Sequence, residues 1–164
     1  MSAERDIYDG FVKRFGKYLK DNDLVIDIGK SNDGLSNYYK SLLPSQIVYK
    51  TCDIEPLKNP DIVYDIENTK LPSEYFNGVL CFGVWEMCNG NPFDLFKGLM
   101  KILKSDGHFV FGVKLAGYPV DWNYDYVRFT ECGIRRLLSK CTILEEEVVK
   151  RDGNPTFFMV IGKK

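Results

Sequence analysis

The sequence predicts an α/β domain with a mostly parallel sheet, and three observations support this prediction. Short apolar runs alternate with amphipathic segments along the chain. The run over residues 24–28 ends in a polar turn bracketed by Gly29 and Gly34, and Asp53 closes the next apolar run. A buried strand, a turn with accessible backbone N–H groups and a carboxylate for ribose hydroxyls are typical of an α/β nucleotide site. We therefore expect a ligand that contains adenosine.

The composition is that of one globular domain over residues 1–164. The hydrophobic content of 45% supports a core, and a chain of this size buries about 70% of its unfolded surface on folding. Basic and acidic residues are nearly balanced, at 22 and 23, and no dense basic run appears, so nucleic acid is not the expected partner. No apolar stretch approaches the ~20 residues that span a bilayer, and the polar start is unlike a signal peptide. We expect a cytoplasmic protein without a membrane segment.

The cysteines predict neither disulfides nor a metal site. Their number is odd, no C-x-x-C pair occurs, and the lone His108 does not complete a zinc ligand set. We expect reduced, mostly buried thiols, as in a cytosol-like compartment.

The first half of the chain predicts two helices and four strands. Apolar residues recur at helical spacing over residues 5–20, and a second helix is expected to end before Pro44. The expected helices cover residues 5–20 and 35–43, and the expected strands cover 24–28, 47–52, 62–64 and 78–82.

The second half predicts two helices and three strands, which makes seven strands in all. The expected helices cover residues 93–103 and 131–138, and the expected strands cover 108–113, 142–149 and 156–161. A turn at Asp106 and Gly107 is expected before the first of these strands. Asp152 and Gly153 form a hairpin signal, so the last two strands are expected to be antiparallel neighbours. Alternating strands and helices with short connections predict a sheet covered by helices on both faces.

Six segments, in order along the chain, resemble the motifs of class I S-adenosylmethionine (SAM)-dependent methyltransferases. Asp27-Ile-Gly29 is similar to motif I, and Cys52-Asp-Ile-Glu55 is similar to the acidic end of the second strand. The other matching segments are residues 61–67, 76–87, 99–107 and 125–130. The likeness spans roughly residues 20–164 and is greatest to small domains of the methyltransferase type 11.

The resemblance implies a Rossmann-like fold with a cofactor half over about residues 24–82 and an acceptor half over about residues 83–164. It implies SAM as cofactor and S-adenosyl-L-homocysteine (SAH) as product. Matching the motifs residue by residue gives the expected cofactor-binding residues Asp27, Gly29, Lys30, Ser31, Asp53, Ile54, Asp65, Ile66 and Phe82.

Three residues depart from the family pattern. Ser31 stands where the motif usually has glycine, and Asn77 replaces the usual acid at the start of the fourth strand. Met87 replaces the histidine that usually follows Glu86, which removes one proton acceptor.

The acceptor site is expected in the loops after the fourth and fifth strands. Its candidate bases are Glu86, Asp121 and Asp125, and its candidate acceptor-binding residues are Trp85, Tyr118, Trp122, Tyr126 and Arg128. Aromatic and hydrogen-bonding side chains suit a sugar ring, so we expect O-methylation of a sugar, a glycan or a similar small polar molecule. Plainer roles are open for the same residues: core packing for the tryptophans, a structural cap for Glu86, and an ion pair between Arg128 and Asp125.

Two other nucleotide-binding motifs and a non-catalytic role are alternatives to this hypothesis. Gly29, Ser31 and Gly34 approach the dinucleotide fingerprint, but the chain has no separate substrate domain and ends in a hairpin. Gly29-Lys30-Ser31 resembles the end of a P-loop, but Leu24 stands where the first glycine is needed. A non-catalytic SAM-binding or scaffold module is the main alternative. A homodimer and a place within a longer polypeptide are also open.

Overall fold

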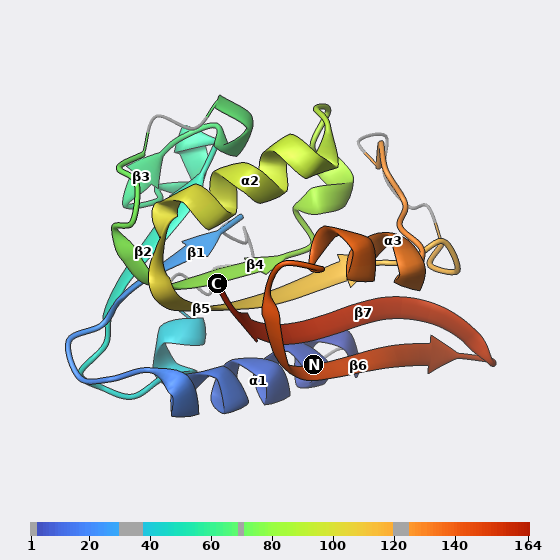
Figure 1. Cartoon of the computed structure of the whole chain (residues 1–164), viewed down its shortest axis with the longest axis horizontal. Coiled ribbons are helices and arrows are strands. Elements are labelled where there is room, and N and C mark those ends of the chain that lie inside the picture. The colour runs from blue at the N-terminus through green and yellow to red at the C-terminus, as the bar shows by residue number, and fades with distance from the viewer. Residues whose placement is uncertain (1–2, 30–37, 69–70, 120–124) are drawn as a thin grey trace.

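The computed structural model describes residues 3–29, 38–68, 71–119 and 125–164, and it forms a seven-stranded sheet with helices on both faces (Figure 1). The sheet order is β3-β2-β1-β4-β5-β7-β6. The strands are β1 (Leu24–Ile28), β2 (Val48–Asp53), β3 (Ile62–Val63), β4 (Phe76–Phe82), β5 (Leu103–Lys114), β6 (Thr142–Arg151) and β7 (Asn154–Lys163). The helices are α1 (Ala3–Phe15), α2 (Pro92–Ile102) and α3 (Glu131–Leu137).

The sheet is parallel from β3 to β5 and antiparallel only around β7. Strand β7 pairs antiparallel with both β5 and β6, as the hairpin signal at Asp152 and Gly153 predicts. The chain proceeds from β1 to one edge of the sheet and then returns to the other side of β1 with β4, so the strand order reverses between β1 and β4. The predicted class I methyltransferase-type fold is confirmed. Ligands bind at the carboxyl ends of the strands beside such a reversal.

Two layers of helices cover the sheet. Helix α1 lies on one face and α2 and α3 lie on the other (Figure 1). Alternate strand residues supply the two cores because successive side chains in a strand point to opposite faces. Val25 and Leu80 pack with α1, whereas Ile26 and Val79 belong to the core that includes α2 and α3.

Local sequence accounts for where the later helices begin. The Asn91 side chain accepts a hydrogen bond from the Phe93 N–H, and Pro92 occupies the first turn of α2. The Thr130 hydroxyl accepts from the Gly133 N–H at the start of α3. Both are N-caps of the type that satisfies the free N–H groups of a first turn.

The expected helices near the amino terminus differ in detail. The expected helix over residues 5–20 is divided in two: the α-helix α1 ends at Phe15, and a 3-10 turn over Gly16–Tyr18 follows it. The described part of the expected helix over residues 35–43 is a 3-10 helix, Tyr39–Leu42, while its earlier residues lie outside the described ranges.

Strand β5 begins five residues earlier than expected. Its ladder with β4 jumps from the pair Phe76–Leu103 to the pair Gly78–His108, so the extra residues of β5 form an irregularity within the strand. The Asp-Gly pair at residues 106–107 therefore lies in an irregular strand instead of a turn. No helix in the described part of the chain is long and apolar enough to cross a membrane.

Candidate cofactor and acceptor site

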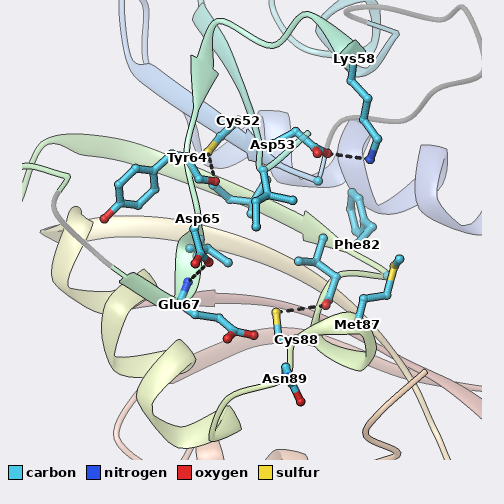
Figure 2. A pocket seen from close by; sticks show the side chains of 16 residues that line it. Cys52, Asp53, Lys58, Tyr64, Asp65, Glu67, Phe82, Met87, Cys88 and Asn89 are labelled. Carbon is cyan, nitrogen blue, oxygen red and sulfur yellow. Dashed lines mark hydrogen bonds and ion pairs between the residues drawn. The ribbon is translucent and has the colours of Figure 1, made fainter. Parts of the chain in front are cut away.

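A cavity of about 310 Å³ lies at the carboxyl ends of β1, β2 and β4, where the strand order reverses (Figure 2). The strand ends and the loops that follow them form its wall. The lining residues are Ile28, Gly29, Cys52, Asp53, Ile54, Lys58, Tyr64, Asp65, Ile66, Glu67, Phe82, Gly83, Val84, Met87, Cys88 and Asn89.

Asp53 supplies a buried carboxylate at the end of β2, with only 5% of the residue exposed. One carboxylate oxygen accepts a hydrogen bond from the Glu55 N–H at 2.8 Å, and the other lies 2.9 Å from the Lys58 ammonium (Figure 2). These contacts hold the carboxylate against the cavity wall. Each oxygen has a second lone pair with which a hydroxyl of a bound ligand can pair.

Gly29 is required at the end of β1 for two independent reasons. Its φ is +88°, a region that residues with a side chain rarely adopt. A Cβ at this position would also lie 2.2 Å from Cγ2 of Val84, in the loop after β4. The structure therefore leaves no room for a side chain at this position, and the obstacle is Val84.

The loops after β3 and β4 are joined at the far end of the cavity. Asp65 accepts from the Glu67 N–H at 2.9 Å, and Glu67 in turn accepts from the Gly90 N–H at 3.1 Å. Burial raises the pKa of the Cys52 and Cys88 thiols to about 12, so both are neutral near pH 7. This end of the cavity therefore combines hydrogen-bonding groups with uncharged sulfur atoms, a suitable environment for a flat polar ring.

Asp27, a predicted cofactor residue, is not among the described residues that line this cavity. Its carboxylate accepts a 2.5 Å hydrogen bond from the Tyr49 hydroxyl, and the residue is 8% exposed. Side chains alternate along β1, so Ile28 lines the cavity while Asp27 points to the opposite face. Burial raises the pKa of Asp27 to about 7; the charge of Asp53 adds to this shift and the Tyr49 hydrogen bond opposes it.

Six of the nine predicted cofactor residues line the cavity: Gly29, Asp53, Ile54, Asp65, Ile66 and Phe82. Lys30 and Ser31 lie outside the described residues and stay predictions. Lys58 is a wall residue that was not predicted, although its position five residues after Asp53 is a signal for an ion pair. Met87 also lines the cavity, whereas its sequence indicated only the replacement of a histidine.

Trp85 and Glu86 are turned into the core, so the expectation that they face an acceptor is corrected. Trp85 is 2% exposed and packs against Phe111 and Phe129. Glu86 is fully buried, and its Oε1 atom accepts from the Lys114 N–H at 2.7 Å. Burial raises the pKa of Glu86, which favours the neutral acid.

The backbone of Glu86 also joins two loops. Its carbonyl oxygen accepts hydrogen bonds from the N–H groups of Tyr126 and Val127, at 2.8 and 3.2 Å. Together with the side-chain bond to β5, these contacts link the end of β4 to the loop that precedes α3. Glu86 therefore has the structural capping role that the sequence left open.

Asp125 and Arg128 form a close ion pair with two hydrogen bonds. The Asp125 side chain is only 1% exposed, and the hydrogen bond from Arg128 holds its pKa below the usual value. A carboxylate that is ion-paired and has a lowered pKa is a weak base. The structural role of Asp125, an ion pair with Arg128, therefore fits better than the role of a catalytic base. Tyr126 is 52% exposed, while Asp121 and Trp122 lie outside the described residues.

Tyr118 packs against Phe157 with ring centroids 4.8 Å apart, and the Lys114 ammonium lies 4.9 Å from the Tyr118 ring centroid. Lys114 and Tyr118 lie where β5 ends and the following loop begins, on the acceptor side predicted from the sequence, and Phe157 belongs to the neighbouring strand β7. In the described ranges, no group of three His, Cys, Asp or Glu side chains is placed to hold a metal ion.

Comparisons with known proteins agree with this fold. Residues 34–111 match the family model of a methyltransferase domain. A search of curated protein sequences found no match. N-methyltransferase NodS from Bradyrhizobium japonicum WM9, solved in complex with SAH, has a similar structure, with a TM-score of 0.75 and 14% identity over 96% of this chain and 86% of that one.

Two further solved structures share the fold. A SAM-dependent methyltransferase from Mesorhizobium loti has a TM-score of 0.69 and 16% identity, over 95% of this chain and 99% of that one. The 1,6-didemethyltoxoflavin-N1-methyltransferase of Burkholderia thailandensis has a TM-score of 0.65 and 15% identity, over 98% of this chain and 82% of that one.

The sheet order and the solved structures of similar architecture show that the chain has the fold of class I SAM-dependent methyltransferases, as its motifs predict. The match to the methyltransferase family model covers slightly less than half of the chain.

Proposed function

We propose that this protein binds SAM in the cavity beside Asp53 and transfers its methyl group to a small polar acceptor, with a hydroxyl of a sugar or glycan as the leading candidate. The observation that carries the proposal is the buried Asp53 carboxylate at the end of β2, beside the strand reversal. A carboxylate at this position is suited to accept from the two hydroxyls of a ribose. SAM supplies an activated methyl group, so the protein mainly has to align the acceptor and exclude water.

The cavity supports this assignment on both sides of Asp53. Gly29 brings bare backbone to the opening, because a side chain there would collide with Val84. Asp65 and Ile66 form the end where the adenine is expected, and Phe82 forms the side that faces the acceptor half. The residues present therefore fit the adenosyl group in polarity and in the bare backbone that they offer.

The chemistry of the acceptor depends on whether a base is available. A hydroxyl needs to lose a proton as it is methylated, and efficient general bases have a pKa near the working pH. Glu86 is sealed in the core, and Arg128 lowers the pKa of Asp125. Of the three candidate bases expected from the sequence, Asp121 therefore stays the candidate for a hydroxyl acceptor.

An amine acceptor is a second candidate. An amine can lose its proton to solvent before it reaches the site. Glu86 is hydrogen-bonded to the Lys114 N–H and Asp125 is ion-paired with Arg128, so neither is placed to act as a base. This favours an acceptor that needs no base. Two proteins of similar structure are N-methyltransferases by name. A non-catalytic SAM-binding or scaffold domain is the alternative to both candidates.

A transfer assay with matched acceptors tests the proposal. The protein is incubated with SAM and either glucose or glucosamine, and SAH formation is measured. Mass spectrometry and NMR of the product identify the methylated atom. A methylated oxygen supports the leading candidate, and a methylated nitrogen supports the second. SAH binding without transfer to any member of a broad panel of polar acceptors indicates the non-catalytic alternative.

A further inference from the structure

Lys58 is a residue of the cavity wall whose backbone is fixed by a short turn. It is the last residue of a 3-10 helix, Pro56–Lys58, that follows β2. The Glu55 side chain caps this helix by accepting a hydrogen bond from the Leu57 N–H at 3.1 Å. Asn59 ends the helix in the left-handed region, with a φ of +48°. The backbone that carries Lys58 is therefore held at the start and at the end of the turn.

The same turn binds both oxygens of the Asp53 carboxylate. Oδ1 accepts from the Glu55 N–H at 2.8 Å, and Oδ2 accepts from the Lys58 ammonium at 2.9 Å (Figure 2). The pair is shielded from solvent, because the Asp53 side chain is 4% exposed and the Lys58 side chain is 25% exposed. A shielded pair is screened by salt much less than a pair on the surface. Lys58 therefore helps to set the direction in which Asp53 presents its remaining lone pairs to the cavity.

The Lys58 ammonium has more donors than the ion pair uses. An ammonium group carries three N–H bonds. Within the described ranges, the Asp53 carboxylate is the one hydrogen-bond partner of this ammonium. Lys58 and Asp53 both line the cavity, so the wall offers N–H donors directly beside carboxylate lone pairs.

A donor beside an acceptor matches the chemistry of two neighbouring hydroxyls. Each hydroxyl has one O–H donor and an oxygen that accepts. A carboxylate alone can pair with the O–H donors of a ribose, but it offers nothing to the hydroxyl oxygens. The Lys58 ammonium can donate to one of these oxygens, and hydrogen bonds from an ionised donor are stronger than those between neutral groups.

We propose that Lys58 is a specificity-determining residue of the cofactor site, which donates a hydrogen bond to one ribose hydroxyl of SAM while its ion pair keeps Asp53 directed at the other. The two side chains then recognise the pair of hydroxyls together, and a cofactor that lacks the hydroxyl bound by Lys58 is discriminated against. This inference rests on the proposed function, because it concerns the cofactor of the same reaction.

The test compares SAH with its 2′-deoxy and 3′-deoxy analogues by calorimetric titration of wild type and Lys58→Met. We expect Lys58→Met to weaken SAH binding by about ten-fold, the scale of one hydrogen bond from a charged donor. For the analogue that lacks the hydroxyl bound by Lys58, the two proteins are expected to differ by less than about three-fold, because that contact is absent from both complexes. The other analogue keeps the contact and is expected to stay sensitive to the substitution. Circular dichroism checks that the variant is folded.

Lys50→Met is the matched control. Lys50 lies in β2 and also pairs with an aspartate, Asp61 at 3.4 Å, but it is not among the described residues that line the cavity. We expect this variant to bind all three ligands like wild type. Equal weakening of SAH and both analogues by Lys58→Met would indicate only a structural role and overturn the inference. Tighter SAH binding by Lys58→Met would also overturn it, because the ammonium would then compete with the ribose.

SAH binding to wild type tests the cofactor assignment separately. Absence of that binding refutes the proposed function. A protein that binds SAH, loses affinity with Asp53→Ala and is unaffected by Lys58→Met refutes only the inference about Lys58.

Discussion

Replacement of Glu86 distinguishes a structural role from a catalytic one. Its Oε1 atom accepts from the Lys114 N–H at 2.7 Å in a fully buried position. Glu86→Gln keeps an acceptor oxygen there, so we expect a change in the free energy of unfolding of less than about 1 kcal/mol and a kcat within a few-fold of wild type. Glu86→Leu leaves a buried N–H without a partner, which costs about 1–3 kcal/mol.

The magnitude is measurable in a chain of 164 residues. For a domain of this size, each kcal/mol shifts the Tm by about 2–4 °C, so Glu86→Leu is expected to lower it by roughly 2–12 °C. Urea unfolding and thermal denaturation of both variants provide the stability assay, and initial rates of SAH formation provide the kcat.

The pH dependence gives an independent readout. Because burial raises the pKa of Glu86, the folded state keeps a proton that the unfolded state releases at the same pH. The contribution of Glu86 to stability therefore falls as the pH rises from its ordinary pKa to its raised value, and Glu86→Gln removes that dependence. A kcat reduced about 100-fold in Glu86→Gln, with unchanged unfolding, would refute this reasoning and identify Glu86 as a general base.

Two further substitutions test Gly29, which follows β1, and the buried acid Asp27 within β1. Gly29→Ala is expected to destabilise the fold by about 2 kcal/mol or more, because the new Cβ collides with Val84 and the φ of +88° is unfavourable for alanine. Adding Val84→Ala removes the collision but not the unfavourable φ, so we expect the double variant to recover only part of the lost stability. Thermal denaturation that shows Gly29→Ala to be as stable as wild type contradicts this account. Asp27→Asn is expected to flatten the loss of stability that wild type shows between about pH 4 and pH 7, because the pKa of Asp27 is raised to about 7 while asparagine still accepts from Tyr49. Urea unfolding across that range checks this, and identical profiles for the two proteins argue against it.

The sheet was predictable because its strands are apolar runs bounded by turn residues. Strand β1 has the bounds expected from its sequence, and the terminal hairpin follows from Asp152 and Gly153. The start of β5 was not predictable, because an Asp-Gly pair is typical of a turn and only tertiary pairing with Phe76 and Gly78 keeps it within a strand.

The site was predictable as far as single strand ends determine it. Gly29 and Asp53 line the cavity because each directly follows or ends a parallel strand. The residues after β4 form a 3-10 helix, in which successive side chains point about 120° apart. The sequence does not say which of them faces the cavity, and the structure turns Met87 toward it and Trp85 and Glu86 into the core.

Calorimetric titration of SAH into wild type and Asp53→Ala tests the central claim most directly. Loss of a buried carboxylate that accepts from ribose hydroxyls costs on the order of 2 kcal/mol, so we expect wild type to bind and Asp53→Ala to bind about 30-fold more weakly. Asp94→Ala, which removes an exposed acid of α2, is expected to bind like wild type. Circular dichroism confirms that the variants are folded. Absence of SAH binding to wild type, or equal affinity of wild type and Asp53→Ala, contradicts the account.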